Sequence, residues 1–96
     1  MVKSLYHWVE EEIAITERDM PRMRNQQDRL YQTGYLSGLT HMQDVMKTAI
    51  ITLEWLKHKH NTAMSRAHGN TAYNLDAPVL QYWIGYAEAY QFAMDR

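Results

Sequence analysis

Apolar residues recur at spacings of three and four along most of the chain, and this is the period of an α-helix. In the first stretch, residues 2–19, this spacing joins Val2, Leu5, Val9, Ile13 and Thr16. Pro21 follows; a proline ends or kinks a helix but is tolerated in the first turn of a new one, for which Asp19 is a candidate N-cap. The pattern predicts a helix over residues 2–19.

The second stretch, residues 22–67, carries apolar residues on two faces. One face holds Tyr31, Tyr35, Gly38, Met42, Val45, Ala49, Leu53, Leu56, His60, Ala63 and Ala67, and a neighbouring face holds Leu36, Leu39, Met46 and Ile50. A surface helix needs one apolar face, so two faces indicate two packing partners. An unbroken helix would be about 68 Å long, which is too long for a compact monomer. We expect either a break near Gly34 or Gly38 or a helix that projects into an oligomer, and we favour the oligomer.

Residues 66–77 form the clear loop, in which Gly69 or Asn70 can close the preceding helix. Asp76 ahead of Pro78 starts a third helix that runs to about Met94. No segment alternates between apolar and polar residues at period two, so we expect no sheet. The sequence predicts one all-α domain over residues 1–96, a long helical hairpin with a short third helix, assembled as a homo-oligomeric helical bundle.

One motif occurs twice, in residues 31–44 and again in residues 82–95. Both copies read Tyr-x-x-Gly-Tyr-x-x-small-x5-Asp. A glycine and a small residue four positions later leave a groove on one helix face, where a second helix can approach closely. Unless the repeat is a coincidence, the helices meet at these grooves, within a chain or across a symmetric interface. The residues expected at an oligomer interface are Gly34, Tyr35, Gly38, Met42, Val45, Ala49, Leu53, Leu56, Gly85 and Tyr86.

Composition restricts the classes of function. The chain is 46% hydrophobic and 22% charged, which excludes wholesale disorder. Cysteine is absent, which excludes disulfides and thiolate metal sites. The net charge of −1 offers no general attraction to nucleic acid. The amino-terminal sequence is no signal peptide and no apolar run is long enough to cross a bilayer, so we expect a cytoplasmic protein without a membrane partner.

Motifs for catalysis are weak. His41 and Asp44 share a helix face, but two ligands do not make a metal site, and a surface hydrogen bond or an interface histidine explains them better. The acidic run at residues 10–12 invites comparison with helical nucleotide pyrophosphohydrolases, but the second acidic cluster of those enzymes is missing. We therefore expect no catalytic residue, no metal, no cofactor and no enzymatic activity.

Aromatic residues are abundant, with seven tyrosines and three tryptophans. Tyr82, Tyr86 and Tyr90 follow one another at intervals of four, a ladder typical of a core or an interface. The alternative is a ligand pocket in which a ring stacks on a nucleobase while a basic residue holds phosphate. Two neighbourhoods combine the needed residues, and the candidates for ligand or partner binding are Arg24, Arg29, Tyr31, Lys57, Lys59, Arg66, His68 and Tyr73.

Residues 31–46 carry a Gly-x-x-x-Gly-Leu-x-His-x-x-Asp pattern at Gly34, Gly38, Leu39, His41 and Asp44. This pattern resembles helices in small accessory proteins of phages and prophages. The resemblance implies a non-enzymatic, phage-encoded binding protein that inhibits a host defence or replication factor by occupying its surface. One alternative is an oligomeric sponge that sequesters a nucleotide signal, and another is a small nucleic-acid-associated regulator.

Overall fold

In the part of the chain that the structure describes, every regular element is a helix, and the prediction of an all-α fold is confirmed. The computed structural model describes residues 4–72 and 77–95, with side chains described for residues 4–67 and 79–95. The elements are α1 (Leu5–Asp19), the 3-10 turn η1 (Met20–Arg22), α2 (Gln26–Met46), α3 (Leu53–Ala72) and α4 (Ala77–Met94). Within these residues, no helix combines the length and the apolar character that crossing a membrane requires.

The helices begin at polar side chains that cap free backbone N–H groups. Ser4 Oγ accepts a hydrogen bond from the His7 N–H at 3.2 Å and caps α1. Asn25 Oδ1 accepts from the Gln27 N–H at 2.7 Å and caps α2. Asp19 occupies the N-cap position of η1 and Pro21 lies in its first turn, as predicted, but the Asp19 side chain makes no capping hydrogen bond. The new helix that starts there is a short 3-10 turn between α1 and α2, and α2 itself begins at Gln26.

The predicted long second helix is divided into α2 and α3 by residues 47–52, and not near Gly34 or Gly38. This short segment contains four β-branched residues, which lower helix propensity. The Thr52 hydroxyl accepts a hydrogen bond from the Trp55 N–H at 3.1 Å, and Glu54 lies in the first turn of α3. These are ordinary start signals of a helix. The break explains how the chain fits within a longest dimension of 44 Å. The predicted loop over residues 66–77 starts too early, because α3 continues to Ala72.

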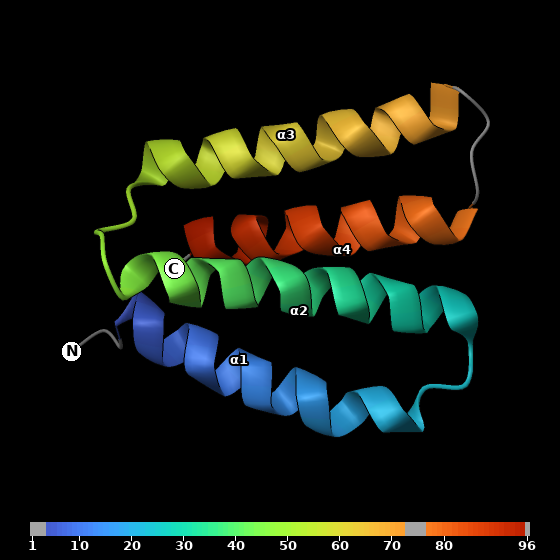
Figure 1. The fold of residues 1–96 in the computed structure, drawn as a ribbon, viewed down its shortest axis with the longest axis horizontal. Coiled ribbons are helices and arrows are strands. Elements are labelled where there is room, and N and C mark those ends of the chain that lie inside the picture. The colour runs from blue at the N-terminus through green and yellow to red at the C-terminus, as the bar shows by residue number, and fades with distance from the viewer. Residues whose placement is uncertain (1–3, 73–76, 96) are drawn as a thin grey trace.

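The helices pack in the order α1, α2, α4, α3 (Figure 1). The most extensive contact joins α2 to α4, which run side by side in the same direction, while α1 and α3 run the opposite way on either side. The core lies between these helices, where the largest fully buried side chains are Tyr90, Leu39, Met42 and Val9. Each half of the chain is thus a pair of antiparallel helices, and the two halves meet through α2 and α4.

The two copies of the repeated motif pack against each other in register. Gly34 lies against the backbone of Tyr82, and Gly85 lies against the backbone of Tyr31. A Cβ on Gly38 would be 2.8 Å from the Cβ of Ala89, the corresponding small residue of the second copy. The predicted close contact is confirmed, and of the two arrangements left open the structure has the one within a single chain.

The register extends to the outer helices. Residues 26–43 of α2 correspond to residues 77–94 of α4, each 51 positions further on, as from Gly34 to Gly85. The same displacement carries buried Thr16 of α1 onto buried Ala67 of α3, and half-buried Leu5 onto buried Leu56. These two pairs of equivalent positions are therefore covered by the packing in both halves of the molecule.

Most residues expected at an interface between copies are buried by packing within a single chain. Buried positions are Gly34, Tyr35, Gly38, Met42, Leu56 and Gly85; Val45 and Tyr86 are half-buried; Ala49 and Leu53 are exposed. The two apolar faces of residues 22–67 are thus satisfied within one chain, because this stretch forms two helices that each pack on α4. The two apolar faces therefore do not require a second copy of the chain, and assembly stays a prediction.

Candidate binding pockets

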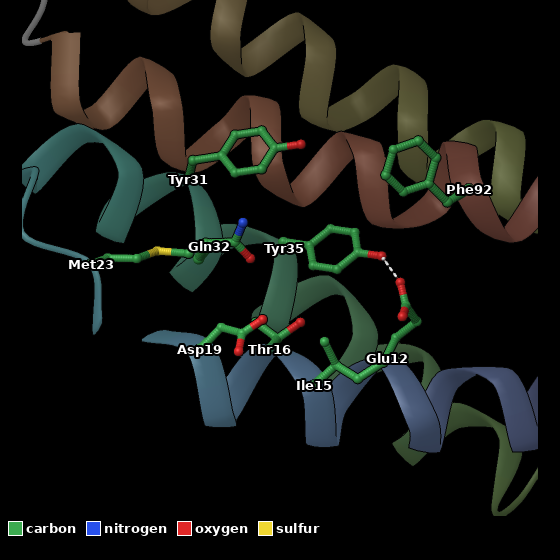
Figure 2. A pocket seen from close by; sticks show the side chains of 9 residues that line it. All are labelled: Glu12, Ile15, Thr16, Asp19, Met23, Tyr31, Gln32, Tyr35 and Phe92. Atoms are coloured by element: carbon green, nitrogen blue, oxygen red, sulfur yellow. Dashed lines mark hydrogen bonds between the residues drawn. The ribbon is translucent and has the colours of Figure 1, made fainter. Parts of the chain in front are cut away.

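A pocket of about 240 Å³ opens between α1 and α2 and is bounded on one side by the end of α4 (Figure 2). Its lining combines two carboxylates with apolar and aromatic side chains, namely Glu12, Ile15, Thr16, Asp19, Met23, Tyr31, Gln32, Tyr35 and Phe92. Ile15 and Phe92 are large apolar residues that stay 42% and 40% exposed. The pocket therefore has an apolar rim that the fold itself leaves uncovered.

Tyr35 forms the floor of this α1–α2 pocket and ties it to α1. Its ring is buried and meets the Phe92 ring edge-on, with the ring centroids 5.9 Å apart. Its hydroxyl donates a hydrogen bond to Glu12 Oε1 at 2.8 Å, drawn as a dashed line in Figure 2. The second oxygen of this carboxylate can accept a further bond. Asp19 faces the pocket two turns later along α1 and pairs with exposed Arg18 at 3.4 Å.

A second pocket of about 240 Å³ opens between α3 and α4. Lys59, Thr62, Ala63 and Arg66 line it from α3, and Tyr82, Trp83 and Tyr86 line it from α4. The guanidinium of Arg66 lies over the Trp83 ring, 4.9 Å from the ring centroid. The ammonium of Lys59 lies 5.6 Å from the centroid of Trp55. The lining of this α3–α4 pocket thus combines two cationic side chains with three aromatic ones, and one cation, Arg66, lies against the aromatic residues.

The two pockets occupy equivalent places in the two halves of the molecule. Displacement by 51 positions carries Tyr31, Gln32 and Tyr35 of the first pocket onto Tyr82, Trp83 and Tyr86 of the second. On the outer helices the same displacement carries Glu12 onto Ala63 and Ile15 onto Arg66. The two copies of the motif therefore form equivalent pockets whose linings differ in charge. Carboxylates line the α1–α2 pocket, which suits a cation, and basic side chains line the α3–α4 pocket, which suits an anion.

The tyrosine ladder of α4 serves both the core and the second pocket. Ring centroids are 6.3 Å apart between Tyr82 and Tyr86, and 5.2 Å apart between Tyr86 and Tyr90. Tyr90 is fully buried, and its hydroxyl has no hydrogen-bond partner among the described residues. Burial raises the pKa of Tyr90 far above its usual range, and the neighbouring Tyr86 hydroxyl contributes less. The expectation of a core ladder holds for Tyr90, while Tyr82 and Tyr86 are pocket walls.

His41 and Asp44 do not bond to each other and have separate partners. The His41 ring stacks on Trp55 with centroids 5.7 Å apart, and Asp44 pairs with Lys47 at 3.6 Å. Burial lowers the pKa of His41, the charge of Lys59 lowers it further, and Asp44 opposes the change. Within the described residues, no three histidine or acidic side chains gather as metal ligands.

In each of the two predicted ligand neighbourhoods, only some of the candidate residues line a pocket. In the first, Tyr31 lines the acidic pocket, but Arg24 is exposed in the α1–α2 connection and the Arg29 guanidinium donates to the Met23 carbonyl. In the second, Lys59 and Arg66 meet at the α3–α4 pocket, whereas Lys57 is exposed outside it. The side chain of His68 and all of Tyr73 lie outside the described residues.

The sequence reasoning missed several pocket residues, above all Glu12, Asp19, Phe92, Tyr82 and Trp83. The signal that could have found the α4 residues was the repeat itself: once the two copies are aligned, Tyr82 is the counterpart of the candidate Tyr31. No comparable signal marks Glu12 or Phe92, because only the packing of three helices brings them together.

Comparison of the chain with protein-family models, with curated proteins and with solved structures found no match. The functional argument therefore rests on the two pockets.

Proposed function

We propose that this chain is a non-enzymatic binding protein that attaches to the surface of a partner protein through the α1–α2 pocket. The observation that carries the proposal is the exposure of Ile15 and Phe92 at the rim of a hollow that also holds Glu12 and Asp19. Large apolar side chains left exposed around a concave site are typical of protein interaction sites.

The lining specifies the chemistry of the partner. Ile15, Tyr35 and Phe92 suit an inserted apolar side chain, and the carboxylates suit a neighbouring lysine or arginine. The pair of Asp19 with Arg18 is solvent-exposed, and such pairs contribute little, so a partner cation can replace Arg18 at small cost. The partner segment we expect therefore presents an apolar residue next to a basic one.

A protein that binds to the surface of its partner can also inhibit that partner. The resemblance of residues 31–46 to helices of phage accessory proteins favours a host factor as the partner. Inhibition of a host defence or replication factor, as well as the phage origin, is part of this proposal.

The test is selection of random peptides on the immobilised protein, followed by affinity measurements on selected peptides. We expect enrichment of peptides that combine an apolar residue with lysine or arginine. Asp19→Lys and Ile15→Glu should each weaken their binding by about tenfold or more, since central contacts dominate such interfaces.

Exposed neighbours on α1 supply matched controls. Glu17→Lys makes the same charge reversal as Asp19→Lys, and Ala14→Glu adds the same carboxylate as Ile15→Glu; both positions lie outside the pocket lining. These controls should leave affinity unchanged within about twofold. Selected peptides that lack basic residues, or that tolerate Asp19→Lys and Ile15→Glu, would contradict the proposal.

A further inference from the structure

The α3–α4 pocket has its own chemistry, which partner binding at the α1–α2 pocket does not use. From the side chains that meet there, we propose that this second pocket binds a nucleotide. Its base would lie against the aromatic wall of α4, and its phosphate would face the cations of α3. This inference does not depend on the proposed function, because the two pockets share no lining residue.

The cations are placed to act on one ligand. Lys59 and Arg66 are seven residues apart on α3, which puts them two turns apart on the same face, about 10 Å along the axis. Both line the pocket, and neither forms an ion pair with a described residue. No carboxylate belongs to the lining. The pocket therefore offers two positive charges that the described part of the chain leaves uncompensated.

Arg66 is also partly ordered before any ligand arrives. Its guanidinium lies over the Trp83 ring, an interaction that restrains a long side chain without using its hydrogen-bond donors. A guanidinium held in this way keeps its planar fork of donors, and this fork matches the oxygens of a phosphate.

The aromatic wall distinguishes a nucleotide from a simple anion. Tyr82, Trp83 and Tyr86 contact one another, with the Trp83 centroid 5.2 Å from Tyr82 and 5.6 Å from Tyr86. All three are half-buried, so each keeps part of its ring accessible. A phosphate alone needs no such wall, whereas a flat base gains from contact with it. The volume of about 240 Å³ exceeds that of a phosphate group and suits a base with part of its sugar.

The experiment is calorimetric titration of the full chain with four nucleoside 5′-monophosphates, the matching nucleosides, inorganic phosphate and a short single-stranded oligonucleotide. We expect at least one monophosphate to bind about tenfold or more tightly than its nucleoside and than phosphate, because both halves of the ligand contribute. Its affinity should fall as salt rises. Binding should also change tryptophan fluorescence, and Trp83→Leu should reduce both affinity and signal.

Surface variants identify the site. Arg66→Gln and Lys59→Gln should each reduce monophosphate affinity about fivefold or more, whereas Lys57→Gln, which removes the same charge as Lys59→Gln from an exposed residue outside the lining, should have no effect. Circular dichroism melting confirms that each variant folds.

Three results would overturn the inference. The first is failure of all four monophosphates to bind at millimolar concentration. The second is equal binding of phosphate alone. The third is tighter binding of the oligonucleotide by about tenfold or more, which would indicate a nucleic-acid site. None of these outcomes changes the peptide selection at the α1–α2 pocket, so the two proposals can fail separately.

Discussion

Gly34 and Gly85 each lie against the backbone of the other's helix, at the point where α2 and α4 come closest. A Cβ on Gly34 would overlap the Tyr82 carbonyl oxygen, and a Cβ on Gly85 would overlap the Tyr31 carbonyl oxygen. The two contacts are equivalent, because the displacement of 51 positions between the two copies of the motif exchanges them. Since backbone atoms cannot move aside as a flexible side chain can, these positions set the distance between the two halves of the molecule.

Gly85→Ala should therefore destabilise the protein although alanine is the better helix former. The helix-propensity gain is about 1 kcal/mol, and overpacking against backbone should exceed it and leave a net loss of about 2 kcal/mol or more. Urea unfolding followed by circular dichroism measures the change. Thr40→Ala, at an exposed position of α2, is the control and should change stability by less than about 0.5 kcal/mol. A neutral or stabilising Gly85→Ala would show that α2 and α4 do not meet here.

Tyr35→Phe should also reduce stability, because it removes the hydrogen bond from the Tyr35 hydroxyl to the half-buried Glu12 carboxylate. Bonds to charged groups contribute about 1.5–3 kcal/mol, and partial exposure of Glu12 reduces the expected loss to about 1 kcal/mol. The same urea measurement applies. In a Glu12→Gln background the substitution should cost less, and equal losses in both backgrounds would assign the effect to packing.

Tyr90→Phe, in contrast to Tyr35→Phe, should not reduce the stability of the protein. The Tyr90 hydroxyl is buried and has no hydrogen-bond partner among the described residues, so its removal relieves a desolvation penalty while the ring stays in place. We expect unchanged stability or a gain of up to about 1 kcal/mol. A loss of stability as large as that of Tyr35→Phe would mean that this hydroxyl has a partner in solution.

The pH dependence of stability should contain a contribution from His41. Burial and the charge of Lys59 lower its pKa in the folded chain, while the unfolded chain titrates near the ordinary value of about 6.5. Between these two values the unfolded state binds more protons, so stability rises with pH and is lost as pH falls below about 6.5.

Comparing the wild type with His41→Gln by urea unfolding from about pH 7 to pH 5 isolates this contribution. The stability of the variant should depend less steeply on pH than that of the wild type. Parallel curves for wild type and His41→Gln would contradict the expected contribution.

The first and last helices were predictable because their signals are local. Pro21 marks the end of α1, and Pro78 marks the start of α4 to within one residue. The division between α2 and α3 also has local signals, namely the β-branched residues Thr48, Ile50, Ile51 and Thr52, with Thr52 as a cap. These signals are weak beside the apolar periodicity that continues across the break, since propensity differences are fractions of a kcal/mol per residue.

The sequence by itself determined that the chain is helical, that it contains the same small-residue motif twice, and that helices approach closely at those glycines. These are properties of residue spacing and of the missing glycine side chain. Only the tertiary structure decided that the two copies meet within one chain, in parallel and in register. The tertiary structure also decided which charged side chains line each of the two pockets. A motif contains no information about its partner or about the outer helices, and the packing of α1 and α3 makes one equivalent hollow acidic and the other basic.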